Sequence, residues 1–79
     1  MSRMSARFIA PRFGQTASGI YKIWEEMGLV TKDKFGDWVL TNLGREIGGR
    51  MSSGNHLSVP TFDFDTIAKM TREFLDSKK

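Results

Sequence analysis

The chain has 79 residues, 12 lysines and arginines against nine aspartates and glutamates, and a formal net charge of +3. This length is typical of one small domain, so we expect residues 1–79 to form a single domain. There is no cysteine and a single histidine, which excludes a disulfide framework and argues against a zinc site.

No apolar run approaches the length of a membrane span, and no apolar segment follows the N-terminal arginines as it would in a secretory signal. We therefore expect a cytoplasmic protein without a membrane partner. The positive charge is concentrated near the start of the chain: residues 1–24 carry four basic residues and no acid, whereas residues 51–79 carry four of each. A basic surface favours polyanions, with nucleic acid ahead of an acidic membrane.

The first helix is predicted over residues 3–12, where apolar residues recur at helical spacing. Pro11 lies inside this stretch, so the helix is expected to kink, to end early, or to begin at Ala10 with Pro11 in its first turn. Gly14 then permits a tight turn between this helix and the next.

The second helix is predicted to begin near Gln15 or Thr16, with Thr16 of a type that caps helix N-termini. Gly28 stands where a left-handed C-cap is expected, and Leu29 can fold back onto the last turn. The apolar stripe of the helix follows the spacing of a buried face and consists of Ile20, Ile23, Trp24 and Met27.

The next segment is predicted to be a β-hairpin, with apolar strands at 30–31 and 38–40 around the polar stretch KDKFGD. Thr41 is expected to cap a short helix over residues 42–49, which its three glycines keep weak. The sequence therefore predicts a β-hairpin and then a short helix after the second helix.

The last third is predicted to begin with a loop over residues 50–58, which contains His56. Residues 59–65 follow as a short strand that Pro60 confines to a sheet edge or a strand start. Asp65 is expected to cap the final helix, whose buried face would consist of Ile67, Met70, Thr71, Phe74 and Leu75. The fold class predicted by this order of elements is α+β, with a small antiparallel sheet.

Four residues in the N-terminal half have the spacing of a helix-turn-helix. Ala10 lies four residues before Gly14, while Ile20 and Ile23 lie six and nine residues after it. Such a motif needs a small residue where its two helices pack closely, a glycine or similar residue in the turn, and an apolar inner face on the second helix.

On these residues the sequence resembles the helix-turn-helix of phage antirepressors and regulators. The stretch GDWVLTNLGREIGGR is similar to the wing and following turn of winged-helix regulators, and VPTFDFDTIAKM is similar to the closing strand and helix of antirepressor C-terminal domains of the KilA-C type. The resemblance implies a winged helix-turn-helix, with a helical core and a small antiparallel sheet as wing. It also implies a phage or prophage regulatory protein that binds double-stranded DNA.

The resemblance places the exposed face of the second helix in a major groove. The residues that it puts on this face are Thr16, Ala17, Ser18, Tyr21 and Lys22. Their hydroxyl and ammonium groups can bond to phosphates or base edges, and the Ala17 methyl can meet a thymine methyl. Flanking contacts to the DNA backbone, which position a protein without specifying sequence, would come from Arg12, Lys32 and Lys34.

Other interpretations remain open. Lys32 and Lys34 alternate with Asp33, so the hairpin is equally well explained as an ordinary solvated element. The same fold would also suit a protein-interaction module that binds and modulates a host or phage protein. A homodimer or a partner protein is expected if the chain binds specific DNA.

Two further classes of function are less favoured by the residues. Binding of RNA or of single strands would need an aromatic sheet face beyond Phe62 and Phe64.

Asp63 and Asp65 alternate with these rings, which fits a strand with one solvent-exposed face better than a catalytic carboxylate pair. No nucleophile, base and orienting group can be assembled, so we predict no enzyme, no cofactor and no metal.

Overall fold

The computed structural model describes residues 3–54 and 57–78, and the fold class is α+β, as predicted. The helices are α1 (Ala6–Ile9), the 3-10 helix η1 (Ala10–Phe13), α2 (Ala17–Glu26), α3 (Asn42–Glu46) and α4 (Phe64–Ser77). The strands are β1 (Arg3–Met4), β2 (Val30–Lys32), β3 (Trp38–Leu40), β4 (Arg50–Gly54) and β5 (Leu57–Asp63). They form an antiparallel sheet in the order β1–β5–β4 and a separate antiparallel pair, β2–β3.

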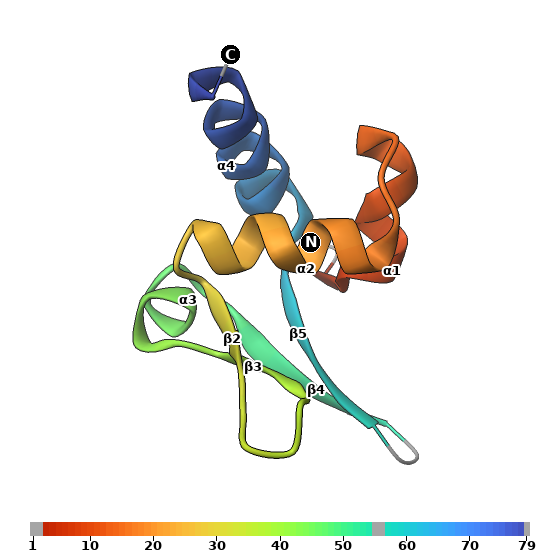
Figure 1. Ribbon diagram of the computed structural model, residues 1–79, viewed down its shortest axis with the longest axis vertical. Coiled ribbons are helices and arrows are strands. Elements are labelled where there is room, and N and C mark those ends of the chain that lie inside the picture. The colour runs from red at the N-terminus through yellow and green to blue at the C-terminus, as the bar shows by residue number, and fades with distance from the viewer. Residues whose placement is uncertain (1–2, 55–56, 79) are drawn as a thin grey trace.

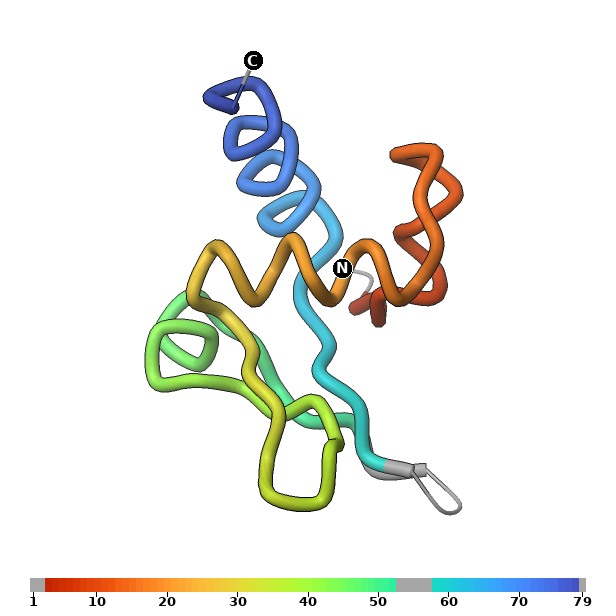
Figure 2. The backbone as a smooth tube through the Cα atoms, in the orientation of Figure 1, coloured from red at the N-terminus to blue at the C-terminus, as the bar shows by residue number. Residues whose placement is uncertain are grey.

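Helix α2 crosses the middle of the molecule, in front of β5 and the start of α4 (Figure 1). Helix α4 extends to one side of α2, whereas the β2–β3 and β4–β5 hairpins extend to the other side, and α1 lies at the N-terminal end of α2 (Figure 1). Figure 2 shows the backbone of β5 running from the hairpin end of the molecule past α2 and directly into α4.

The first helix begins later than predicted, because residues 3–4 join the sheet beside the end of β5. Pro11 lies in the first turn of η1, where a missing backbone N–H costs nothing, so the alternative with a helix start at Ala10 describes this segment best. Phe8, which shares the helical spacing of the segment, is 65% exposed. Gly14 has a φ of +64° and makes the predicted turn.

Trp24 lies at the centre of the core and joins three elements. Its ring centroid is 5.0 Å from that of Phe62 on β5, in an edge-to-face arrangement. Its indole N–H donates a hydrogen bond of 3.1 Å to the Thr71 hydroxyl of α4, and both residues are fully buried. The predicted stripe of α2 is confirmed, since Ile20 is also buried and the remaining members pack against this core.

Both ends of α2 follow the sequence rules. The Thr16 hydroxyl accepts a hydrogen bond of 3.0 Å from the Gly19 backbone N–H, which confirms the N-cap. Gly28 has a φ of +83°, and the Leu29 N–H returns to the Trp24 carbonyl, which confirms the C-terminal turn.

The predicted β2–β3 hairpin and the short helix after it are both present. Lys32 lies opposite Trp38 in the register of the hairpin, and the Thr41 hydroxyl accepts from the Gly44 N–H as the N-cap of α3. Helix α3 packs so closely on the connection between α2 and β2 that a Cβ at Gly44 would overlap with the Leu29 carbonyl oxygen.

The segment predicted as a loop over residues 50–58 is instead β4 and the start of β5. This segment is extended despite its polar residues because β4 and β5 pair with each other. The antiparallel pairing begins with Arg50 opposite Thr61 and continues to Gly54 opposite Leu57. His56, which we expected in the loop, lies outside the described residues.

Pro60 is neither at a strand start nor on an edge strand, because β5 is the middle strand of its sheet. It is tolerated because, among the residues that the structure describes, β1 pairs only with residues 62–63, so Pro60 has a neighbouring strand, β4, on one side alone. The strand also ends earlier than predicted: Asp63, rather than Asp65, caps α4 by accepting from the Thr66 N–H. The alternation of Phe and Asp therefore does not continue as a strand, since Phe64 already belongs to α4.

Candidate nucleic-acid interface

The N-cap and the first two turns of α2 present small polar groups and one cation to solvent. Thr16, Ser18 and Lys22 are all exposed, whereas Ala17 is half-buried against the core. Ser18 and Lys22 are four residues apart and so lie one above the other on the same face of the helix. Three of the five helix residues predicted for DNA contact are thus exposed on the N-cap and first two turns of α2, whereas Ala17 is only half-exposed.

The fifth of these residues, Tyr21, is turned toward the β2–β3 hairpin. Its ring stacks on that of Trp38 with centroids 5.1 Å apart and an angle of 11° between the planes. It also meets the edge of Trp24 at 6.0 Å. Burial raises the pKa of the Tyr21 hydroxyl above its ordinary value of 10.0. Tyr21 therefore fixes the position of the hairpin relative to α2, which is a role the sequence analysis did not predict.

The hairpin carries its two lysines at its outer end, and both are exposed. The Lys32 ammonium lies 5.1 Å from the centroid of the Trp38 ring, and the Lys34 ammonium lies 5.2 Å from that of Phe35. Among the residues that the structure describes, neither lysine forms an ion pair with the neighbouring Asp33. Their charges are therefore available to an anionic partner.

Asp33 has a structural role in the turn of the hairpin. Its Oδ1 accepts hydrogen bonds from the backbone N–H groups of Phe35, at 2.8 Å, and Asp37, at 2.9 Å. The side chain thus closes an Asx-type turn, and Gly36 supplies the positive φ of +83° that the turn requires. The alternation of lysine and aspartate in this stretch consequently does not mean that the charges cancel in pairs.

Arg12 is not part of this arrangement. Its guanidinium carbon lies 4.6 Å from the centre of the Phe64 ring, so the side chain is held at the contact between η1 and α4. This contact covers one of the two phenylalanines considered as a stacking platform, and the other, Phe62, is 1% exposed. The sheet therefore offers no aromatic face for single-stranded nucleic acid at these two positions.

The C-terminal half of α2 is acidic. Glu25 and Glu26 are exposed, and the Glu26 carboxylate pairs at 2.8 Å with the ammonium of Lys78, the C-cap of α4. The N-terminus of the helix, where the dipole favours an anion, thus lies at Thr16, and Lys22 adds a positive charge in the second turn.

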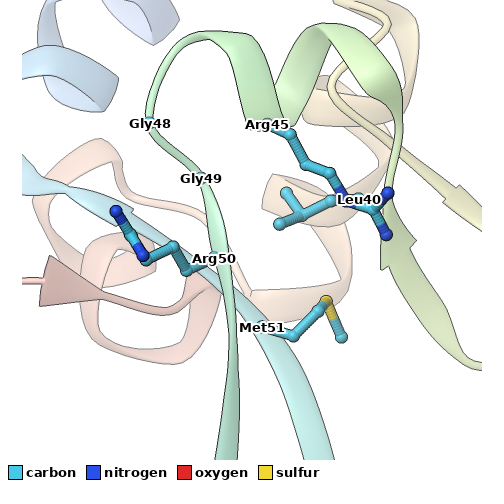
Figure 3. Close-up of a pocket in the computed structure, with 6 residues that line it drawn as sticks. All are labelled: Leu40, Arg45, Gly48, Gly49, Arg50 and Met51. Carbon is cyan, nitrogen blue, oxygen red and sulfur yellow. The ribbon is translucent and has the colours of Figure 1, made fainter.

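A surface pocket of about 430 Å³ beside β4 is lined in part by two arginines, Arg45 and Arg50. Leu40 and Met51 give it an apolar wall, and Arg45 lies on the same side of the strand (Figure 3). Arg50 extends to the opposite side of β4, so the two guanidinium groups do not converge on one point (Figure 3). The pocket therefore lacks the paired donors that an anion site would use.

The part of the chain that the structure describes contains no group of three or more histidine, cysteine, aspartate or glutamate residues placed to hold a metal ion. Within residues 3–54 and 57–78, no helix is both long and apolar enough to span a bilayer.

Comparisons with protein-family models, with curated proteins and with solved structures found no match.

Proposed function

We propose that the chain is a regulatory DNA-binding protein of the phage type, built as a winged helix-turn-helix. In this proposal α1 and η1 are the first helix, α2 is the reading helix, and the β2–β3 hairpin is the wing. Lys22 and Ser18 would meet the major groove, and Lys32 and Lys34 would meet the phosphates beside it.

The observation that carries the proposal is the stacking of Tyr21 on Trp38. This contact, with centroids 5.1 Å apart, joins the polar end of α2 to the hairpin that carries the two lysines. A helix and a hairpin fixed in this way can contact neighbouring parts of one duplex at the same time. The cost of ordering the two elements is then already met in the free protein.

The proposal is tested by titrating the protein into a labelled random-sequence duplex and following fluorescence anisotropy. A single module of this kind is expected to bind non-specifically with a Kd of roughly 10⁻⁴–10⁻⁶ M at physiological salt. If about four phosphates are neutralised, the affinity should fall roughly 150-fold between about 50 and 200 mM salt. Binding that is absent even at low salt would contradict the proposal.

Lys22→Ala tests whether α2 is the reading helix. The variant should weaken binding and reduce the slope of log affinity against log salt by about one unit, because one phosphate or base contact is lost. Lys69→Ala is the matched control: Lys69 is also exposed, but it lies on α4, two residues from each of the buried Ile67 and Thr71. Equal losses in the two variants would show that only total charge matters and would remove α2 from this role.

The same titration separates DNA binding from the alternative of a protein-interaction module. An interface with an apolar partner protein would show little dependence on salt, whereas binding to phosphates falls steeply. Failure to bind duplex would therefore direct attention to protein partners of the same surface.

A further inference from the structure

Phe35 at the tip of the β2–β3 hairpin is 77% exposed, which is more than any other large apolar side chain among the described residues. A phenylalanine held in water forgoes the free energy that burial would give it. The ring lies at the end of the element that carries Lys32 and Lys34, where polar residues would serve a solvated turn equally well.

The backbone around Phe35 is held in place by specific bonds. The Phe35 N–H donates to the Asp33 carboxylate at 2.8 Å, and the Gly36 N–H donates to the Asp33 carbonyl at 3.0 Å. With Gly36 in the left-handed region, these bonds fix the direction in which the hairpin tip projects. Phe35 is therefore presented on an ordered turn, so little conformational entropy would be lost on binding.

The surroundings of the ring favour a partner that combines apolar surface with negative charge. The Lys34 ammonium lies 5.2 Å from the Phe35 centroid. Phe35 lies three positions before Trp38, at most about 10 Å along an extended chain. Because Trp38 stacks on Tyr21 of α2, the hairpin that carries Phe35 is fixed in position relative to the helix proposed to read DNA.

We infer that Phe35 is a wedge that enters the minor groove and partly unstacks one base step beside the duplex segment contacted by α2. This inference rests on the proposed function and adds the mode of contact at the hairpin. A base step offers an apolar surface between two phosphate strands, which matches an apolar ring with the Lys34 ammonium beside it. Apolar wedges of this kind widen the minor groove and kink the duplex.

The test compares the wild type with Phe35→Ala and Phe35→Leu on an A·T-rich duplex that carries 2-aminopurine, whose fluorescence rises when it is unstacked. Removal of the ring should weaken binding about 10-fold or more. The slope of log affinity against log salt should stay unchanged, because no charge is removed. Phe35→Leu keeps an apolar wedge and should retain most of the affinity and most of the fluorescence increase.

Lys34→Ala is the matched control at the adjacent position and should instead lower the salt slope by about one unit. Because Phe35 is largely exposed, the alanine variant should melt at the wild-type temperature by circular dichroism. If the wild type binds duplex but Phe35→Ala binds equally well or leaves the fluorescence increase intact, the wedge is refuted and the proposed function stands. If the wild type does not bind duplex at low salt, the proposed function fails, and the wedge fails with it.

Discussion

Thr71→Val tests the hydrogen bond that joins α2 to α4. The substitution keeps the shape of the side chain but replaces the hydroxyl that accepts from the Trp24 indole N–H at 3.1 Å. Both residues are fully buried, so water cannot replace the lost acceptor. The indole N–H would then be left without a partner inside the core.

The expected loss in the free energy of unfolding follows from leaving the buried indole N–H without an acceptor. A buried N–H without an acceptor costs about 1–3 kcal/mol, whereas the change in packing from threonine to valine is small. A domain of this length has a total stability of roughly 4–12 kcal/mol, so the loss is a substantial share. A cost of about 2 kcal/mol corresponds to a fall in Tm of about 8–16 °C.

The assay is urea unfolding followed by circular dichroism, combined with a double-mutant cycle. Trp24→Phe removes the donor, so Thr71→Val in that background should cost no more than about 0.5 kcal/mol. The Thr71 hydroxyl can then donate to a backbone carbonyl of its own helix, as buried threonines do. An equal cost of Thr71→Val in both backgrounds would refute the reasoning, because it would show that the hydrogen bond contributes nothing.

Two further predictions concern the packing of α3 and the ionisation of Tyr21. Gly44→Ala should cost about 3 kcal/mol or more in urea unfolding, because the new Cβ would overlap with the Leu29 carbonyl oxygen. Gly48→Ala, at a φ of +95° with open space around it, should cost only the backbone strain of about 1–2 kcal/mol. Burial raises the pKa of Tyr21, so the unfolded chain ionises first and stability should be lost as pH rises above about 10. Tyr21 is the only tyrosine, so the ultraviolet absorbance of tyrosinate reports its titration directly, and Tyr21→Phe should lose this component of the pH dependence.

The sequence predicted well the elements whose signals are local. Helix α2 has its cap at Thr16, its apolar stripe and its stop at Gly28 within a short span, so each signal reinforces the next. The β2–β3 hairpin and the cap at Thr41 were equally local and are confirmed.

The elements that were missed depend on pairing between distant residues. Residues 3–4 form β1 because they meet the end of β5 some 60 positions later, and nothing in their own composition indicates a strand. Strand β4 is polar and rich in small residues, and its pairing with β5 outweighs its weak intrinsic preference. Asp63 and Asp65 are equally good caps by type, and the choice depends on where the sheet ends.

The sequence predicts which residue types form the candidate site, and the structure adds which of these side chains are exposed and which contact a neighbouring element. Tyr21 was expected on the exposed helix face, but its spacing also allowed contact with a neighbouring element, and Trp38 provides that contact. The sequence does not predict a role for Phe35, because a single apolar residue within a polar turn belongs to no periodic pattern. Its exposure depends on the hydrogen bonds of Asp33, which only the folded turn shows.

The distribution of charge along α2 limits how the helix could lie against a duplex. Glu25 and Glu26 follow Lys22 by three and four residues, so they adjoin it on the helix surface. The negative charge of Glu26 is partly compensated by the Lys78 ammonium, whereas the Glu25 carboxylate would face phosphates if the whole helix lay in the groove. The first turn, with its dipole, would therefore enter the groove, with Lys22 at the groove edge, while the acidic last turn tilts away. Such a tilt keeps the contact short, which is why the proposed function requires the hairpin as a second point of contact.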